Sequence, residues 1–276
     1  MDLLLSKIYP HVLEITMIND FLGTAIKAVE SSGKILIQYF DKLHDSSQKN
    51  ENIRDLVTEV DFLAEKNIKE IITSQFPKHN IIAEESGDLD INSDYCWHVD
   101  PIDGTVNYSQ GIPLCAISVG LELNGEIIVG AVFNPFTEEL FYASKGNGAF
   151  LNGHEIVVSE KNSIEKCIYV AAFSSDSDSK KYKEYQIFGK MNDKTRGVLR
   201  IGSAALALAY LACGRIDGFW AKDLYAWDLA GGLVLVREAG GQISNNHGDP
   251  FVIGEPTLIA SNGYIHNSLL LELKNL

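Results

Sequence analysis

The feature that most constrains this chain is an apolar segment that ends in two aspartates. Residues 95–99 have the pattern of a buried strand, and Asp100 and Asp103 follow it three positions apart. Pro101 lies between them with φ held at about −65°, so the two carboxylates lose much of their freedom to point apart. The sequence therefore predicts a buried strand that brings two acidic side chains to one place.

The backbone after this strand offers further polar groups. Gly104 permits a sharp turn of the chain, and Thr105 is a good N-cap for a helix that starts there. We expect the carbonyl group of Ile102 and the N–H groups of Gly104 and Thr105 to be exposed beside the carboxylates. Oxygen ligands of this kind suit Mg²⁺ or Mn²⁺, and N–H groups at a helix start suit a phosphate oxygen. Metal and phosphate together indicate phosphoryl chemistry.

The charge balance limits the partners. Of the 276 residues, 23 are basic and 37 are acidic, which gives a formal net charge of −14. Such a chain is a poor match for nucleic acid or for an anionic membrane surface. A small anionic substrate is compatible with this charge if bound cations bridge it to the carboxylates. The length and a hydrophobic content of 46% are typical of a globular protein, either one large domain or two halves joined by a sheet.

Cysteine usage and hydropathy favour a cytoplasmic protein. The four cysteines are far apart, and none forms a Cys-x-x-Cys pair, so we expect buried free thiols in a reducing compartment. The apolar run at residues 3–5 is too short for the core of a signal peptide. The apolar runs also fall short of the ~18 residues that a membrane-spanning helix needs.

The first half is predicted to be a mixed α+β unit. Residues 20–41 have an amphipathic helical pattern, and a second helix is expected to end before Pro77. The polar segment 44–52 between them is expected to be a mobile loop. Short strands follow, most of them in an antiparallel meander. The expected strands are 79–83, 95–99, 115–122, 126–133, 140–144 and 149–151. Gly146 and Gly148 lie in a turn of this meander, so we interpret them as turn residues and not as a dinucleotide-binding loop.

The second half alternates strands with helices, which is typical of a layered α/β structure. The expected strands are 167–173, 197–201 and 216–220. The expected helices are 182–191, an Ala- and Leu-rich helix that follows residues 202–205 and ends at 213, and 227–239. We therefore divide the chain into an N-terminal α+β half, 1–152, with most of the acidic candidates, and a C-terminal α/β half, 153–276, which contributes Asp228 and a pocket.

Three further acidic residues are candidates for the same site, and each also has a purely structural interpretation. Asp61 follows Thr58 by three positions and completes a capping box in that interpretation. In the structural interpretation of Glu84, it is the first of two acidic residues that are simply solvated at a strand end. In the structural interpretation of Asp228, it is the N-cap of the helix that follows it. His98, inside a strand, is interpreted as a packed core residue, and the spacing of the histidines does not suggest a zinc site.

Taken together, these motifs resemble those of the Mg²⁺-dependent, lithium-sensitive phosphatase superfamily, and specifically the inositol monophosphatase family. The matching segments are residues 55–58 with Asp61, 84–86, 100–105 with 107–108, and 227–228 through 240–241. Weaker matches at 148–153 and 202–205 fill the gaps, so the resemblance extends from about residue 20 to the end. Four ordered motifs at compatible spacing favour metal ligation over the structural interpretations of the acidic residues.

The resemblance implies an α/β (α+β) fold, a layered α-β-α-β-α sandwich of the inositol monophosphatase and fructose-1,6-bisphosphatase type, and usually a homodimer. It also implies Mg²⁺ as the cofactor. By this resemblance, one ion is held by Glu84, Asp100 and the carbonyl of Ile102. A second is held by Asp100, Asp103 and Asp228, and a third, weaker ion lies near Glu84.

The same resemblance implies roles for the residues around the metals. Asp61 and Thr105 match the pair that orients and deprotonates the attacking water, and Glu84 completes the catalytic set. The N–H groups of Gly104 and Thr105 hold the phosphate. The rest of the substrate site is made by Ala204, Ala221, Lys222 and Asp228.

Two departures from the family pattern concern the substrate. Inositol-specific members carry a Glu seven residues before the Trp-Asp aspartate, where this chain has Ala221 followed by Lys222. The family also often has a His or a basic residue at the position of Gln110. We expect hydrolysis of inositol-1-phosphate or related small polyol and sugar phosphates, with a fructose-1,6-bisphosphatase or a 3′,5′-bisphosphate nucleotidase as alternatives. A catalytically silent binding or regulatory homologue is a further alternative, but none of the expected ligands is missing.

Overall fold

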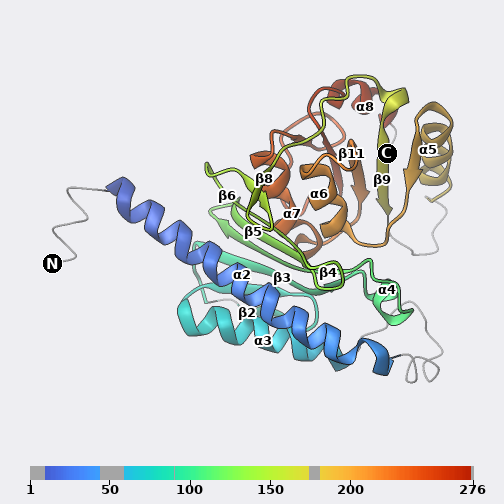
Figure 1. Ribbon diagram of the computed structural model, residues 1–276. Coiled ribbons are helices and arrows are strands. Elements are labelled where there is room, and N and C mark those ends of the chain that lie inside the picture. Colours follow the sequence, from blue (N-terminus) through green and yellow to red (C-terminus); the bar gives the residue numbers. More distant parts are fainter. Residues whose placement is uncertain (1–9, 44–58, 90, 174–180, 275–276) are drawn as a thin grey trace.

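Five layers make up the molecule. The computed structural model describes residues 10–43, 59–89, 91–173 and 181–274. Two helices, a sheet, two further helices, a second sheet and a last pair of helices follow one another (Figure 1). The predicted α-β-α-β-α sandwich is confirmed. The predicted loop at 44–52 and the motif at 55–58 lie outside the described residues.

The larger sheet has eight strands, and its neighbouring pairs are antiparallel except for the pair β1–β3. In spatial order the strands are β2 (Gly87–Leu89), β1 (Asn80–Ala83), β3 (Tyr95–Asp103), β4 (Ala116–Leu123), β5 (Glu126–Asn134), β6 (Glu139–Ser144), β7 (Ala149–Leu151) and β8 (His154–Ile156). Because β8 pairs with β7, this sheet continues past residue 152. The division of the chain at that residue stays a prediction.

The outer helices α2 (Pro10–Leu43) and α3 (Glu59–Gln75) cover one face of this sheet (Figure 1). Phe21 and Leu36 of α2, Ile68 of α3 and Trp97 of β3 are all buried between helices and sheet. In the described residues the helix α2 extends back to Pro10, earlier than the predicted residue 20.

The middle layer consists of α6 (Ala204–Ala212) and α7 (Ala226–Glu238), which pack between the two sheets (Figure 1). The backbone of α7 lies directly on β4 and β5. A Cβ on Gly120 would be 2.6 Å from the Cβ of Ala230, and one on Gly130 would be 2.6 Å from Val234 Cγ1. Only glycine leaves room for this approach, which places the first turn of α7 beside the end of β3.

The second sheet has five strands and is covered on its outer face by α5 (Lys181–Lys194) and α8 (His266–Glu272) (Figure 1). Its spatial order is β10 (Gly197–Leu199), β9 (Ile168–Phe173), β11 (Gly218–Lys222), β13 (Thr257–Ser261) and β12 (Gln242–Ser244). Tyr169, Met191, Trp220 and Leu269 are buried between this sheet and its outer helices.

The turn at residues 145–148 connects β6 with β7, as the sequence predicts. The N–H groups of Gly146 and Gly148 each donate to the carboxylate of Glu238, at 2.9 Å. The anion in this glycine turn is therefore the chain's own side chain. Because Glu238 is the last residue of α7, the contact ties that helix to the first sheet.

Two expectations about single side chains can be compared with the structure. His98 is buried on β3, and its Nε2 lies 2.8 Å from Glu122 Oε2, which confirms a packed side chain. All four cysteines are free thiols, but only Cys115 and Cys167 are buried.

Across the described ranges, no helix is long and apolar enough to span a membrane.

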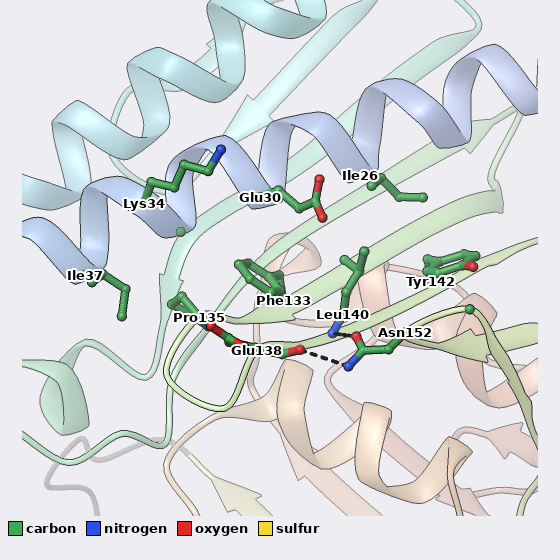
Figure 2. Close-up of a pocket in the computed structure, with 12 residues that line it drawn as sticks. Ile26, Glu30, Lys34, Ile37, Phe133, Pro135, Glu138, Leu140, Tyr142 and Asn152 are labelled. Atoms are coloured by element: carbon green, nitrogen blue, oxygen red, sulfur yellow. Dashed lines mark hydrogen bonds between the residues drawn. The ribbon is translucent and has the colours of Figure 1, made fainter.

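A groove of about 810 Å³ runs between α2, the strands β5 and β6, and the turn at residues 152–153 that follows β7. Figure 2 shows its apolar side chains, among them Ile26, Phe133 and Leu140, with Glu30 and Lys34 on the helix above. None of the acidic residues predicted for the metal site lines this groove.

Candidate active site

Three carboxylates meet where β3 ends and α7 begins. The nearest oxygens of Asp100, Asp103 and Asp228 all lie within 4.8 Å of one another. Residues three apart in a regular strand point to opposite faces. The register between β3 and β4 shifts between Asp100 and Asp103, and this irregularity breaks the alternation so that both carboxylates face α7.

Asp103 is held by the amino terminus of α6. Its carboxylate accepts hydrogen bonds from the N–H groups of Ala204 (3.1 Å) and Ala205 (2.6 Å) and from the hydroxyl of Ser203. Carboxylates are favoured at a helix start, where N–H groups lack partners within the helix. Ala204 was predicted to contact substrate, but its N–H is engaged with Asp103 in this structure.

Asp228 lies in the first turn of α7 and its Oδ2 accepts from the N–H of Tyr225, at 2.7 Å. Because the N-cap of α7 is Tyr225, the interpretation of Asp228 as the N-cap is wrong. The contact uses one lone pair of Oδ2 and leaves Oδ1 for other partners.

The backbone between the two β3 aspartates is fixed by short contacts. Asp100 Oδ1 accepts from the N–H of Ile102 at 3.0 Å, and the Ile102 carbonyl accepts from the Thr105 hydroxyl at 3.0 Å. The short helix α4 (Thr105–Ser109) has Gly104 as its N-cap, with φ +100°. The prediction of Thr105 as N-cap is therefore wrong, because Thr105 is the first helical residue and its hydroxyl turns back to the β3 strand.

Glu84 follows β1 at the exposed rim of the cluster. The turn that carries it is held by Glu65, a buried residue of α3. Glu65 accepts from the N–H of Glu85 at 2.8 Å and from the hydroxyl of Ser86. Asp61, one helical turn earlier on α3, is fully buried, and its charge contributes to the raised pKa of Glu84.

Burial and mutual repulsion raise the pKa values of the clustered carboxylates. Burial first, and then the charges of Asp228, Glu85 and Asp61, raise the pKa of Glu84 to about 8. Burial and the charge of Asp103 raise the pKa of Asp228 to about 7. Burial raises the pKa of Asp103 to about 6 against the hydrogen bonds from α6 that lower it. The pKa of Asp100 is raised by burial and by the charges of Glu84, Asp103, Asp228 and Asp61.

This donor set fits a divalent cation. In the part of the chain that the structure describes, no Lys, Arg or His forms an ion pair with Glu84, Asp100, Asp103 or Asp228. Buried anions need a compensating charge. Clustered carboxylate and carbonyl oxygens are the ligands that Mg²⁺ prefers.

A cavity of about 390 Å³ opens beside the carboxylates. Asp103, Asp228, Gly202 and Ala204 line one part of it, and Arg200 lines another. Two of the predicted substrate residues lie elsewhere. Ala221 is only 1% exposed and belongs to the core between the sheets, and Lys222 pairs with Glu184 at 2.9 Å. Gln110, the other departure from the family pattern, is exposed at the C-cap of α4.

Comparison of the chain with known protein families gives a match to one of them. The model of the inositol monophosphatase family matches residues 17–275. The chain belongs to the inositol monophosphatase family.

Individual relatives support the assignment over nearly the whole chain. The inositol-1-monophosphatase of Synechocystis sp. is 40% identical over 250 residues, which cover 90% of this chain and 87% of that protein. The fructose-1,6-bisphosphatase/inositol-1-monophosphatase of Thermotoga maritima is 36% identical over 251 residues, 91% of this chain and 94% of that one. The solved structure of inositol monophosphatase from Anabaena (Nostoc) sp. matches with a TM-score of 0.84 at 36% identity, covering 94% of this chain and 96% of its own.

Three residues contribute to the site although the sequence analysis predicted no role for them. Glu65 lies four positions after Asp61, and this helical spacing places both on one face of α3. Ser203 is an N-cap type of residue before an apolar helix, a signal that predicts the helix start but not the contact with Asp103. Arg200 is a lone basic residue in an apolar stretch, and its position beside the pocket depends on the fold.

Proposed function

We propose that this protein is a Mg²⁺-dependent phosphomonoesterase that acts on inositol-1-phosphate or on related small polyol and sugar phosphates. The observation that carries the proposal is the trio Asp100, Asp103 and Asp228, which converges without a compensating cationic side chain among the described residues. Membership of the inositol monophosphatase family and the enzyme names of the relatives support it.

The predicted ligand sets agree with the geometry to different degrees. Asp100, Asp103 and Asp228 would hold one Mg²⁺ ion, since their oxygens already converge. Glu84, Asp100 and the carbonyl of Ile102 would hold another, and Glu84 is the member at the exposed rim. When bound, Mg²⁺ supplies charge compensation for the phosphate and lowers the pKa of a water molecule, which becomes the nucleophile.

The protein's own groups would orient and deprotonate that water. The Thr105 hydroxyl donates to the Ile102 carbonyl, so its oxygen lone pairs are left to accept a hydrogen bond from water. The buried carboxylate of Asp61 is the base to which we assign the proton. The N–H groups of Gly104 and Thr105, at the start of α4, would hold the phosphate oxygens.

We infer further that the protein works in the cytoplasm as a homodimer and that Li⁺ inhibits it, as the family resemblance implies. Four free thiols suit a reducing compartment. Light scattering of the purified protein tests the dimer, and phosphate release at increasing LiCl tests the inhibition.

Phosphate release from a panel of sugar, polyol and nucleotide phosphates, with and without Mg²⁺, tests the proposed activity. We expect release to require Mg²⁺, to include inositol-1-phosphate, and to be abolished in Asp228→Asn, because an amide is a poorer, uncharged ligand. Asp193→Asn, on the exposed side of α5, is the matched control and should behave as wild type. Normal turnover by folded Asp228→Asn at saturating Mg²⁺ would contradict the proposal.

A further inference from the structure

Among the described residues, Arg200 lines the pocket, and Lys222 pairs in the sheet with Phe173, which also lines it. The two cationic side chains differ in how free they are to bind an anion. Lys222 Nζ is 2.9 Å from Glu184 Oε1, and both side chains are largely covered, at 23% and 7% exposed. A cation in such a pair is already neutralised, and leaving Glu184 unpaired would be costly. Lys222 is therefore poorly placed to meet an anionic group of a substrate.

Arg200 is held differently. It lies between β10 and α6, with its guanidinium carbon 4.2 Å from the centroid of the Phe173 ring and Nη2 donating to the Phe173 carbonyl at 3.1 Å. Among the described residues it has no carboxylate partner, and its side chain is exposed. A guanidinium has five N–H donors, so one bond to a carbonyl leaves a fork that can bind an anion through two parallel hydrogen bonds.

The segment that carries Arg200 is fixed to the carboxylate cluster. The Ile201 carbonyl accepts from Asn107 Nδ2 at 2.7 Å, and Ser203 donates to Asp103. A Cβ on the intervening Gly202 would be 2.7 Å from Asn107 Nδ2, so this loop lies close against the start of the site. Arg200 and the carboxylates Asp103 and Asp228 therefore face one cavity of about 390 Å³ from fixed positions.

We propose that Arg200 binds a second anionic group, a phosphate or a carboxylate, on the alcohol part of the substrate. The proposal rests on the proposed phosphatase function, which places the scissile phosphate at the carboxylate cluster. A substrate with two anionic groups then extends from the cluster to Arg200 across the cavity. Arg200, and not Ala221 or Lys222, then determines which substrate is preferred. The preferred class is phosphate esters with two anionic groups.

Steady-state kinetics of the Mg²⁺-loaded enzyme test this assignment. The variants are Arg200→Gln and Arg200→Lys, with Lys222→Gln as the matched control. Fructose-1,6-bisphosphate supplies a second phosphate and 3-phosphoglycerate a second carboxylate, whereas glycerol-2-phosphate and inositol-1-phosphate have a single anionic group. Comparison of the first two substrates shows which anion the site prefers.

We expect Arg200→Gln to lower kcat/KM for at least one substrate with two anionic groups by about 10- to 100-fold, mainly through KM, the effect of losing a charge-assisted hydrogen bond. Its kcat/KM for the two single-anion esters should stay within about twofold of wild type. Arg200→Lys should retain part of the preference, because it keeps the charge but not the fork. Lys222→Gln should show no selective loss.

Four outcomes would overturn the assignment. Equal losses for both substrate classes would indicate a structural role for Arg200. An unchanged kcat/KM in Arg200→Gln for every two-anion substrate would show that another group binds the second anion, and a selective loss in Lys222→Gln alone would identify that group. A wild type that hydrolyses the single-anion esters supports the phosphatase function whatever the Arg200 result, and one that hydrolyses no ester overturns both.

Discussion

Asp103 shows, at the scale of a residue, how one carboxylate serves the fold and the site together. Donors from the start of α6 partly offset the effect of burial, so its pKa is raised only to about 6, against about 7 for Asp228. Both oxygens accept from the helix, and Oδ1, with the single longer bond from Ala204, retains a lone pair for a metal. The helix start therefore keeps Asp103 oriented and readily ionised.

Glu65 is a positioning residue in this account, since it contacts the turn that carries Glu84. In Glu65→Gln an amide N–H would face the N–H of Glu85 or the hydroxyl of Ser86, where a carboxylate now accepts from both. We expect the Mg²⁺ concentration for half-maximal activity to rise about 10-fold or more, with kcat at saturating Mg²⁺ little changed.

Phosphate release as a function of Mg²⁺ concentration measures the Glu65 effect, and circular dichroism checks the fold. Glu70→Gln is the matched control, because Glu70 is exposed on the same helix and its Oε1 lies 3.9 Å from Lys66 Nζ. A Glu65→Gln enzyme with the Mg²⁺ dependence of wild type would show that the turn holds Glu84 without this contact.

At the scale of elements, the position of Asp228 depends on how closely α7 lies against β5. A methyl group on Gly130 would collide with the Gly231 carbonyl oxygen and approach Val234 Cγ1 to 2.6 Å. We expect Gly130→Ala to lower the free energy of unfolding by about 1–3 kcal/mol and to reduce activity as well, because α7 must move away from the sheet.

Chemical denaturation and phosphate release, measured on the same sample, check the Gly130 prediction. Gly189→Ala is the control: nothing lies within 4 Å of its Cβ position on the helix α5, so alanine should stabilise that helix slightly. A Gly130→Ala protein as stable and as active as wild type would mean that the two layers can separate without displacing Asp228.

Most of the elements and the pair Asp100 and Asp103 could be predicted from the sequence because their signals are local, whereas Asp228 was assigned to the site through the family resemblance. Apolar periodicity predicts the strands and helices, and the spacing of Asp100 and Asp103 around Pro101 indicates a shared site. Contacts between distant segments could not be predicted in this way. The bonds from α6 to Asp103 and the pair Lys222–Glu184 depend on layers that meet only in the folded chain.

Helix starts were a second source of error. Thr105 and Asp228 both have the chemistry of an N-cap, but the helices begin at neighbouring positions, after Gly104 and Tyr225. Gly104 takes the left-handed conformation that leaves Thr105 inside the helix. The side chain of Asp228 still satisfies the helix start, from the third position of its first turn.

At the scale of the whole molecule, the candidate site is assembled from three layers. Asp100 and Asp103 come from the larger sheet, Asp228 from the middle helices, and Arg200 from the loop after the edge strand of the second sheet. Packing of both sheets on α6 and α7 is therefore a condition for activity, and loss of either interface should remove it.

A buried histidine makes the stability of the second sheet sensitive to acid. Ser244 donates to the Asn245 carbonyl and so accepts from Nε2 of His266, while Nδ1 accepts from Ser261, each at 2.9 Å. Burial lowers the pKa of His266 to about 4. The neutral form therefore contributes stability that is fully present above pH ~6.5, the unfolded value, and is lost as the pH falls toward 4.

We expect His266→Gln to have a lower free energy of unfolding than wild type at pH 7. Between pH 7 and pH 5 its free energy of unfolding should fall by about 1–2 kcal/mol less than that of wild type. Urea denaturation at the two pH values measures both effects. His154→Gln, at an exposed position, is the control and should leave the difference between the two pH values unchanged. The same loss in His266→Gln as in wild type would assign the acid sensitivity to other groups.

The central claim is that Asp100, Asp103 and Asp228 form a divalent-cation site, and calorimetric titration of Mg²⁺ into the metal-free protein tests it most directly. We expect wild type and Asp193→Asn to bind Mg²⁺, and Asp100→Asn to lose that binding. Metal-free Asp100→Asn should be at least as stable as metal-free wild type, because one buried, mutually repelling carboxylate is gone. Mg²⁺ binding by folded Asp100→Asn with the affinity of wild type would contradict the claim.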